Sequence, residues 1–214
     1  VLYLIKQGKL SHDPSERIKP PKIGKRTPGI ISIDEINMLL EQPNTNTAKG
    51  MRDQAMLELI YATGLRVSEL IALRCTDVNF QANYIQCING NKERMIPFGK
   101  KAKHALKLYM EHARTVFIKD GEENILFSNC QGFPLSRQGI WKLIQRYAKK
   151  AGIKEDLTPH TLRHSFAAHL VENGADLKAV QEILGNSELT SAQTYLYNGN
   201  NKVRDVYIGA HPRA

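Results

Sequence analysis

The residues best suited to chemistry lie between positions 157 and 197. His160 and Arg163 are three residues apart, so in a helix they share one face. An imidazole beside a guanidinium suits a phosphate group, although a solvated helix edge would also account for such a pair. Tyr195 follows in the same stretch, and a helical tyrosine is either a satisfied core residue or a nucleophile.

Two helices are expected to position the His–Arg pair. Thr158 caps the first helix and Pro159 takes its first position. Its apolar residues recur every four positions, at Leu162, Phe166 and Leu170. Gly174 closes this helix, and a second one follows with Asp176 as its cap and Gly185 as its end. The expected inner face of the second helix consists of Leu177, Val180 and Leu184.

A third short helix is expected around the tyrosine. Thr190 and Gln193 have the spacing of a capping box. The box places Tyr195 in the opening turns of that helix.

A further basic residue, Arg66, stands at another helix start. The preceding helix is expected over residues 49–62 and ends at Gly64, and Leu70 and Leu73 face inward from the next one. An arginine at a helix N-terminus opposes the macrodipole, so an anion shared with nearby backbone N–H groups would explain its position. Glu69 is placed to hold either Arg66 or a histidine.

Taken together, these motifs resemble the tyrosine recombinases of the phage integrase family, and within it the Xer recombinases. The matching residues are His160-Thr-Leu-Arg163-His164, Leu184-Gly185, Tyr195 and Thr63-Gly64-Leu65-Arg66-Val67-Ser68-Glu69-Leu70. The resemblance implies a site-specific recombinase that cleaves and rejoins DNA through a 3′-phosphotyrosine intermediate. It serves either chromosome-dimer resolution or integration and excision of a mobile element.

The resemblance also implies a role for each matching residue. Tyr195 is the expected nucleophile, and Arg66 and Arg163 clamp the phosphate with planar guanidinium groups. His160 acts beside them as a hydrogen-bond donor or general base. This chemistry uses neither metal nor nucleotide, so no cofactor is expected, and the chain has no Walker A loop.

Two positions depart from the family pattern. Asn186 follows Leu-Gly where related proteins carry His or Trp, and it can still donate a hydrogen bond to a phosphate oxygen. Asn89 stands where the family has its catalytic lysine, the acid for the leaving oxygen, and an amide cannot deliver a proton. Lys92, across the turn, is a tentative replacement. A DNA-binding relative with impaired catalysis, acting as an accessory or regulatory protein, is therefore the alternative function, and a type IB topoisomerase-like enzyme is a third.

Composition agrees with a nucleic-acid partner. The chain of 214 residues can hold one large domain with an appendage, and its net charge of +9 favours a polyanion, nucleic acid before membrane. The three cysteines, Cys75, Cys87 and Cys130, are scattered and indicate neither a zinc site nor a disulfide framework. A cytoplasmic location fits best, and no apolar run is long enough for a membrane span.

The first 28 residues differ in composition from the rest. Residues 1–9 are apolar and are expected to be the end of a helix, whereas residues 11–28 mix four prolines with basic side chains. Lys22, Lys25 and Arg26 suit a phosphate backbone, although a plain solvated linker would look the same. We expect residues 1–28 to be the end of a core-binding domain with a basic linker, and residues 29–214 to be the catalytic domain.

The pattern of the main domain predicts a mostly helical α+β fold with a small antiparallel sheet. Ser32 and Glu35 form a capping box for a helix that faces Ile36, Leu39 and Leu40 inward. Strands are expected at 77–80, 84–88 and 94–98, with Asn89-Gly90 as a hairpin turn and Pro97 on an edge. Residues 101–117 are expected to be helical and 125–127 to form another strand.

One predicted helix is a candidate DNA contact. Ser136 caps it, and it runs over residues 137–150 with Trp141, Ile144 and Ala148 buried. Its exposed side carries the densest basic group in the chain, Arg137, Lys142, Arg146, Lys149 and Lys150. Such a side contacts a DNA groove or backbone, or is merely solvated.

The tail adds a candidate for contacts between protomers. Val203, Val206 and Tyr207 recur at helical spacing within residues 202–208, and this helix is expected to pack elsewhere, for instance on a neighbouring copy. The expected partners are double-stranded DNA and other recombinase protomers. The resemblance implies a tetramer on paired sites and a monomer or dimer without DNA.

Overall fold

The computed structural model describes residues 1–9, 29–89, 92–119, 124–185 and 199–214. Residues 1–9 contain one short helix, α1 (Leu2–Lys6). The described chain resumes at residue 29 with the main domain. Residues 10–28 lie outside the described part, so the division of the chain at residue 28 stays a prediction.

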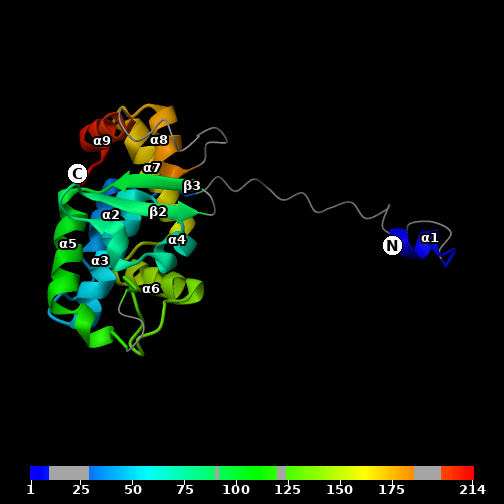
Figure 1. Ribbon diagram of the computed structural model, residues 1–214, viewed down its shortest axis with the longest axis horizontal. Helices are drawn as coiled ribbons and strands as arrows, with labels where there is room; N and C mark the ends of the chain where they lie inside the picture. The colour runs from blue at the N-terminus through cyan, green and yellow to red at the C-terminus, as the bar shows by residue number, and fades with distance from the viewer. Residues whose placement is uncertain (10–28, 90–91, 120–123, 186–198) are drawn as a thin grey trace.

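The predicted fold class is confirmed, because helices pack around a small antiparallel sheet (Figure 1). The helices of the main domain are α2 (Ile33–Leu40), α3 (Ala48–Thr63), α4 (Val67–Ala72), α5 (Lys100–His112), α6 (Arg137–Lys150), α7 (Pro159–Glu172), α8 (Leu177–Leu184) and α9 (Gly199–Ala210). Two short 3₁₀ turns, η1 (Cys75–Asp77) and η2 (Arg114–Phe117), connect them. None of the helices in these ranges is long and apolar enough to cross a membrane.

Helix α3 is the centre of the domain. It is buried over most of its length and packs against α5 on one side and α7 on another. An element covered on several sides cannot show the narrow apolar stripe of a surface helix. Three buried aliphatic side chains, Met56, Leu59 and Ile60, confirm the predicted inner positions.

The sheet consists of three antiparallel strands in the order β1–β2–β3. The strands are β1 (Val78–Asn79), β2 (Tyr84–Asn89) and β3 (Lys92–Pro97). Pro97 lies on the edge strand as predicted, where its missing N–H costs no ladder hydrogen bond. The prediction that Asn89 forms part of the hairpin turn was wrong, because Asn89 still belongs to β2 and its Cα partner across the hairpin is Lys92.

Three predicted helix starts are confirmed by their caps, whereas Asp176 is the N-cap residue of α8 but makes no side-chain capping bond in the described structure. The Ser32 hydroxyl accepts from the N–H of Glu35, and the Glu35 carboxylate accepts from the N–H of Ser32. The Ser136 hydroxyl accepts from the N–H of Gly139 at the start of α6, Thr158 and Thr161 form a second capping box at the start of α7, and Pro159 occupies the first turn of α7. Local hydrogen bonding thus fixes where these helices begin.

Several predictions about individual elements were wrong. Residues 125–127 form no strand in the described structure, since Ile125 makes only an isolated bridge to Arg74. The expected helix over 101–117 ends at His112 and continues as η2. Trp141 and Leu177 are 43% and 63% exposed, because each lies beside the buried stripe of its helix rather than in it.

The tail helix packs on its own domain rather than elsewhere. Helix α9 contacts α7, α8 and β3, and its Tyr207 is buried. The Tyr207 hydroxyl accepts a hydrogen bond of 3.0 Å from the N–H of Gly99. In this structure the apolar side of α9 is therefore covered by the same chain.

Candidate active site

The junction between α3 and α4 presents the first predicted site residue. Gly64 ends α3 with φ of 58°, in the left-handed region that glycine adopts without strain. Two residues later Arg66 is the N-cap of α4, and its backbone N–H donates to the Glu69 carboxylate at 2.8 Å. The Arg66 side chain is 35% exposed and also binds Glu69, at 3.2 Å. Glu69 therefore holds Arg66, one of the two roles predicted for it.

Glu69 is the buried carboxylate of the site. It accepts from Arg66 on one side and from Arg94 of β3 on the other, the latter at 2.8 Å. Burial by itself would raise the pKa of Glu69, but hydrogen bonds and charges from the two arginines outweigh burial and lower it. The group stays ionised and fixes both guanidinium groups.

Arg163 joins three helix ends. It lies in the first turns of α7 and donates through Nη1 to the carbonyl of Gly64, at the end of α3. Its Nη2 donates at 2.6 Å to the carbonyl of Leu184, the last residue of α8. Carbonyl groups at helix C-termini carry partial negative charge and favour a cation there. Burial, and next the nearby charge of Arg66, lower the pKa of Arg163 to about 10.

The arrangement concentrates positive charge in one partly buried place. The charges of Arg66, Arg94 and Arg163 lie close together, and Glu69 compensates only one of them. His160 is exposed in the first turn of α7, on the same helix as Arg163. Such a cluster suits an anion with several oxygen atoms, which a phosphodiester provides.

Arg94 was missed by sequence reasoning. Its guanidinium lies between Glu69 and Gly185, where a Cβ added at position 185 would come within 2.9 Å of Arg94 Cζ. Its Nε is buried without a hydrogen-bond partner among the described residues. The one available signal was its place in the hairpin, opposite Cys87, and that register is not legible from the sequence alone.

Other predicted site residues lie outside the described ranges. These are Asn186 and Tyr195 near the end of the chain, and Lys22, Lys25 and Arg26 before the main domain. For Asn89 and Lys92 the structure gives the backbone register, which pairs them at the end of the hairpin.

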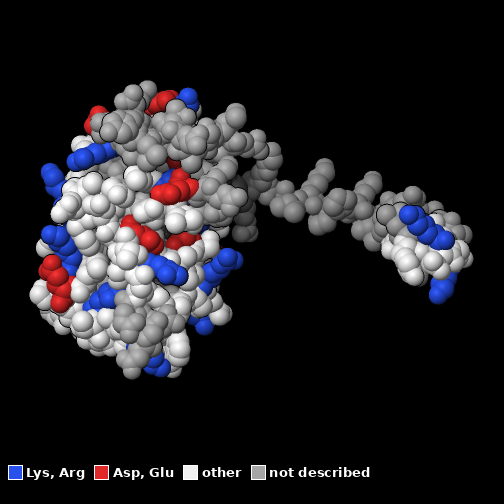
Figure 2. All heavy atoms as spheres, viewed as in Figure 1, with Lys and Arg blue, Asp and Glu red and all other residues white. Residues whose placement is uncertain are grey.

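The basic side of α6 is present but is not uniform. Arg137 and Lys142 are exposed, as predicted, and Arg146 is half exposed and bound to Asp53 of α3 at 2.9 Å. Figure 2 shows basic side chains over the α5 side and over the lower right of the domain, where α6 lies in Figure 1. The excess charge is therefore spread over more than one part of this face.

Comparison with known proteins gives consistent matches along the main domain. The profile described as the Phage integrase family matches residues 30–202. The tyrosine recombinase XerD of Listeria innocua is 47% identical over 214 residues, which are 99% of this chain and 72% of that protein. Its counterpart in Halalkalibacterium halodurans is 44% identical over 213 residues, with 99% and 71% of the two chains covered.

Solved structures agree with these matches. The crystal structure of XerA recombinase has a TM-score of 0.69 at 30% identity, covering 88% of this chain and 67% of that one. XerH recombinase bound to its palindromic difH substrate has a TM-score of 0.66 at 24% identity, covering 88% and 51%. The second similarity concerns the fold alone.

Proposed function

This chain belongs to the phage integrase family, and we propose that it is a site-specific DNA recombinase that cleaves and rejoins strands through a 3′-phosphotyrosine link at Tyr195. The observation that carries the catalytic assignment is the arginine cluster. Arg66 is held by Glu69, and Arg163 is held by the ends of α3 and α8. No observation favours the alternative of a DNA-binding relative with impaired catalysis.

The cluster supports a defined division of labour. Attack on phosphorus adds negative charge to the two non-bridging oxygens, and fixed guanidinium groups stabilise that charge without reorganising. Arg66 and Arg163 take this role, and exposed His160 donates to the phosphate or accepts the proton of the Tyr195 hydroxyl. Asn186 adds a neutral donor to a phosphate oxygen. The covalent link keeps the energy of the broken bond, so the strand can be rejoined without a nucleotide.

We assign the proton for the leaving 5′-oxygen to Lys92. Asn89 cannot donate a proton, and Lys92 is its direct Cα partner across the hairpin. Directly opposed residues of an antiparallel pair have Cβ atoms about 5 Å apart. A lysine at position 92 therefore starts close to the backbone position from which the family's lysine acts.

The proposed partners follow from the reaction. The substrate is duplex DNA, contacted by Lys22, Lys25 and Arg26 before the domain and by Arg137, Lys142 and Arg146 on α6. Exchange of strands between two sites requires two protomers on each, so we propose a tetramer on paired sites and a monomer or dimer without DNA. Because its substrate is DNA, we place the activity in the cytoplasm.

Covalent capture tests this function. A duplex site is first selected by the full chain from a random library and then nicked beside the cleavage position, so that the short strand diffuses away and traps the intermediate. We expect a covalent complex that survives denaturation. Tyr195→Phe should abolish it and leave DNA affinity nearly unchanged, because only the attacking oxygen is lost. An adduct that persists in Tyr195→Phe would transfer the role to Tyr197, and no adduct in the unsubstituted chain would refute the proposed function.

A further inference from the structure

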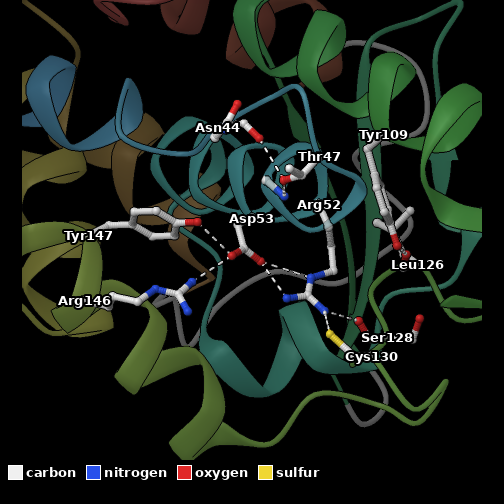
Figure 3. Close-up of polar contacts among 11 residues, drawn as sticks. Asn44, Thr47, Arg52, Asp53, Tyr109, Leu126, Ser128, Cys130, Arg146 and Tyr147 are labelled. Carbon is white, nitrogen blue, oxygen red and sulfur yellow. Dashed lines mark hydrogen bonds and ion pairs between the residues drawn. The ribbon is translucent and has the colours of Figure 1, made fainter. Parts of the chain in front are cut away.

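A buried carboxylate outside the active site connects the central helix to the basic one (Figure 3). Asp53 of α3 is fully buried and accepts four hydrogen bonds. Its Oδ1 accepts from Nε and Nη2 of Arg52, at 3.0 and 2.7 Å. Its Oδ2 accepts from Arg146 Nη2 and from the Tyr147 hydroxyl of α6, both at 2.9 Å.

The charges of this cluster do not cancel. Arg52 is buried and fully engaged, since it pairs with Asp53, donates to the carbonyl of Ser128 at 3.0 Å and lies over the ring of Phe117. Asp53 is therefore already neutralised before Arg146 is counted. Arg146 brings a second positive charge to the same carboxylate, and its side chain is 49% exposed. The surplus charge of the cluster faces solvent.

Arg146 is held on one side and open on the other. Its Nη2 donates to Asp53, and its guanidinium carbon lies 4.7 Å from the centroid of the Tyr147 ring. A guanidinium group has five N–H donors in a planar fork. The half-exposed group has donors beyond the one that binds Asp53, and these can bind an anion without the side chain first having to be ordered.

The position of Arg146 suits a DNA backbone. Helix α6 packs against α4 and α7, whose first turns carry the proposed catalytic residues. Lys142 and Lys149 lie four residues before and three residues after Arg146, so they share its face, and both are exposed. Arg137 lies nine residues before Arg146 and about half a turn around the helix from it, so it does not share the face of these three residues.

We propose that Asp53 is a positioning residue that fixes Arg146 for contact with a DNA phosphate. The inference rests on the proposed function, in that duplex DNA is the bound anion. The fixed position of its guanidinium group distinguishes Arg146 from the neighbouring lysines, whose side chains are flexible and carry a point charge. A lysine cannot bind the carboxylate and a phosphate in the fork geometry of a guanidinium.

The exchange Arg146→Lys tests this distinction, because it keeps the charge and removes the fork. We would measure affinity for a mixed-sequence duplex by fluorescence anisotropy at several salt concentrations. Arg146→Gln removes a charge-assisted hydrogen bond to phosphate, so it should weaken binding roughly tenfold or more. Arg146→Lys should lose at least about fivefold, whereas the same exchange at exposed Arg204 of α9 should change affinity less than about twofold. If the DNA affinity of Arg146→Lys lies within about twofold of that of the unsubstituted chain, the inference is overturned.

A double-mutant cycle tests the part played by Asp53. Asp53→Asn should weaken DNA binding in the unsubstituted background and have no further effect in Arg146→Gln, because its influence passes through Arg146. Equal effects in both backgrounds would overturn the inference. If Asp53→Asn does not fold, Arg146→Lys decides alone, since it leaves the buried pair of Asp53 and Arg52 intact. If the unsubstituted chain is captured covalently but Arg146→Lys does not change DNA affinity, this inference alone is refuted. If the unsubstituted chain does not bind DNA, both this inference and the proposed function are refuted.

Discussion

At the scale of single residues, the proposed active site contains few anionic groups among the residues that the structure describes. One carboxylate, Glu69, serves Arg66 and Arg94, while Arg163 is held by backbone carbonyls that carry only partial charge. A second buried carboxylate would leave this cluster of three arginines with a single net positive charge and would compete with the phosphate. Fixing arginines with carbonyl groups preserves their charge for the substrate.

The proton donor can be identified by a substrate that needs none. A 5′-bridging sulfur leaves as a thiolate without protonation, and general acid catalysis typically contributes about 10²–10⁴-fold. We expect Lys92→Ala to cleave the ordinary substrate slower by a factor in that range and to recover on the sulfur substrate. Cleavage rates on the two substrates, measured in single-turnover reactions, check this.

Asn89→Lys serves as the companion variant to Lys92→Ala. If Lys92 is the acid, this substitution changes little in the presence of Lys92 and restores cleavage to Lys92→Ala. A large acceleration of the ordinary substrate by Asn89→Lys alone would instead mean that the unsubstituted chain lacks an effective acid.

The residues that sequence reasoning found and missed differ in one physical respect. Arg66 stands at a helix start where it opposes the macrodipole, and His160 and Arg163 are a pair at three-residue spacing within a family motif, so all three are marked by their neighbours in the chain. Arg94 and Asp53 gain their roles from partners 25 and 93 positions away. Such partners meet only through the tertiary fold, so neither residue is distinguished by its neighbours in the chain.

At the scale of elements, the turn between α3 and α4 positions the residues of the proposed site. Gly64 has φ of 58°, and an added Cβ would come within 2.6 Å of Phe166 and 2.9 Å of Leu184. Its carbonyl also accepts from Arg163. The turn therefore combines a backbone requirement, a packing requirement and a contact with Arg163 of the proposed active site.

Gly64→Ala should be costly for both stability and cleavage. Left-handed strain and overlap each contribute about 1–3 kcal/mol, so we expect a loss of about 3 kcal/mol in the free energy of unfolding. Gly152→Ala is the matched control, because Gly152 has φ of 74° but nothing within 4 Å of an added Cβ. It should lose only about 1 kcal/mol in urea denaturation. Equal losses would show that overlap at Gly64 is relieved by small shifts.

The last residues of the chain form an element of their own, anchored on α3. His211 is buried and stacks on Tyr207, with ring centroids 4.7 Å apart, and Arg213 pairs with buried Glu58. Burial is the main cause that lowers the pKa of His211 to about 4. Burial also lowers the pKa of neighbouring His169. The fold thus keeps His211 neutral.

This anchoring predicts a loss of stability in mild acid. An unfolded histidine titrates near 6.5, so between about pH 6.5 and about 4 the unfolded chain binds a proton that folded His211 does not. The free energy of unfolding should fall as the pH drops through this window. From pH 7 to pH 5 the contribution of His211 is about 2 kcal/mol. Urea denaturation should show this loss reduced in His211→Gln and unchanged in His104→Gln, which alters an exposed histidine of α5.

Elements were predictable where their signals are local. The caps at Ser32, Ser136 and Thr158 place three helix starts correctly, because each cap bonds to a backbone N–H within three residues. Which side of a helix is buried depends on its neighbours instead. For that reason Trp141 and Leu177 were placed inside and lie exposed, and α9 packs on its own domain.

At the scale of the whole molecule, the charge of +9 predicts strongly salt-dependent DNA binding. Each phosphate contact lowers the slope of log affinity against log salt by about 0.9. Replacing Lys22, Lys25 and Arg26 together by glutamine should therefore make the slope shallower by up to about 3. Anisotropy titrations at increasing salt measure this slope.

A matched triple substitution separates contact from bulk charge. Lys100, Lys101 and Lys107 are exposed on α5, which lies at the left edge of the domain in Figure 1, with α4 at the right edge. Replacing them by glutamine removes the same charge and should leave the slope largely unchanged. Equal changes for the two triple variants would mean that net charge, rather than the segment before the domain, governs binding.

The buried cluster of Asp53 also constrains the order in which this sequence can diverge. A lineage that loses Arg146 first keeps Asp53 paired with Arg52 and remains folded, so only DNA contact is affected. A lineage that loses Asp53 first leaves Arg52 buried and unpaired, and breaking a buried pair in this way costs about 3–5 kcal/mol. Loss of Arg146 before Asp53 is thus tolerated by the fold, whereas loss of Asp53 before Arg146 is not. Among descendants, Asp53 without Arg146 should be found more often than Arg146 without Asp53.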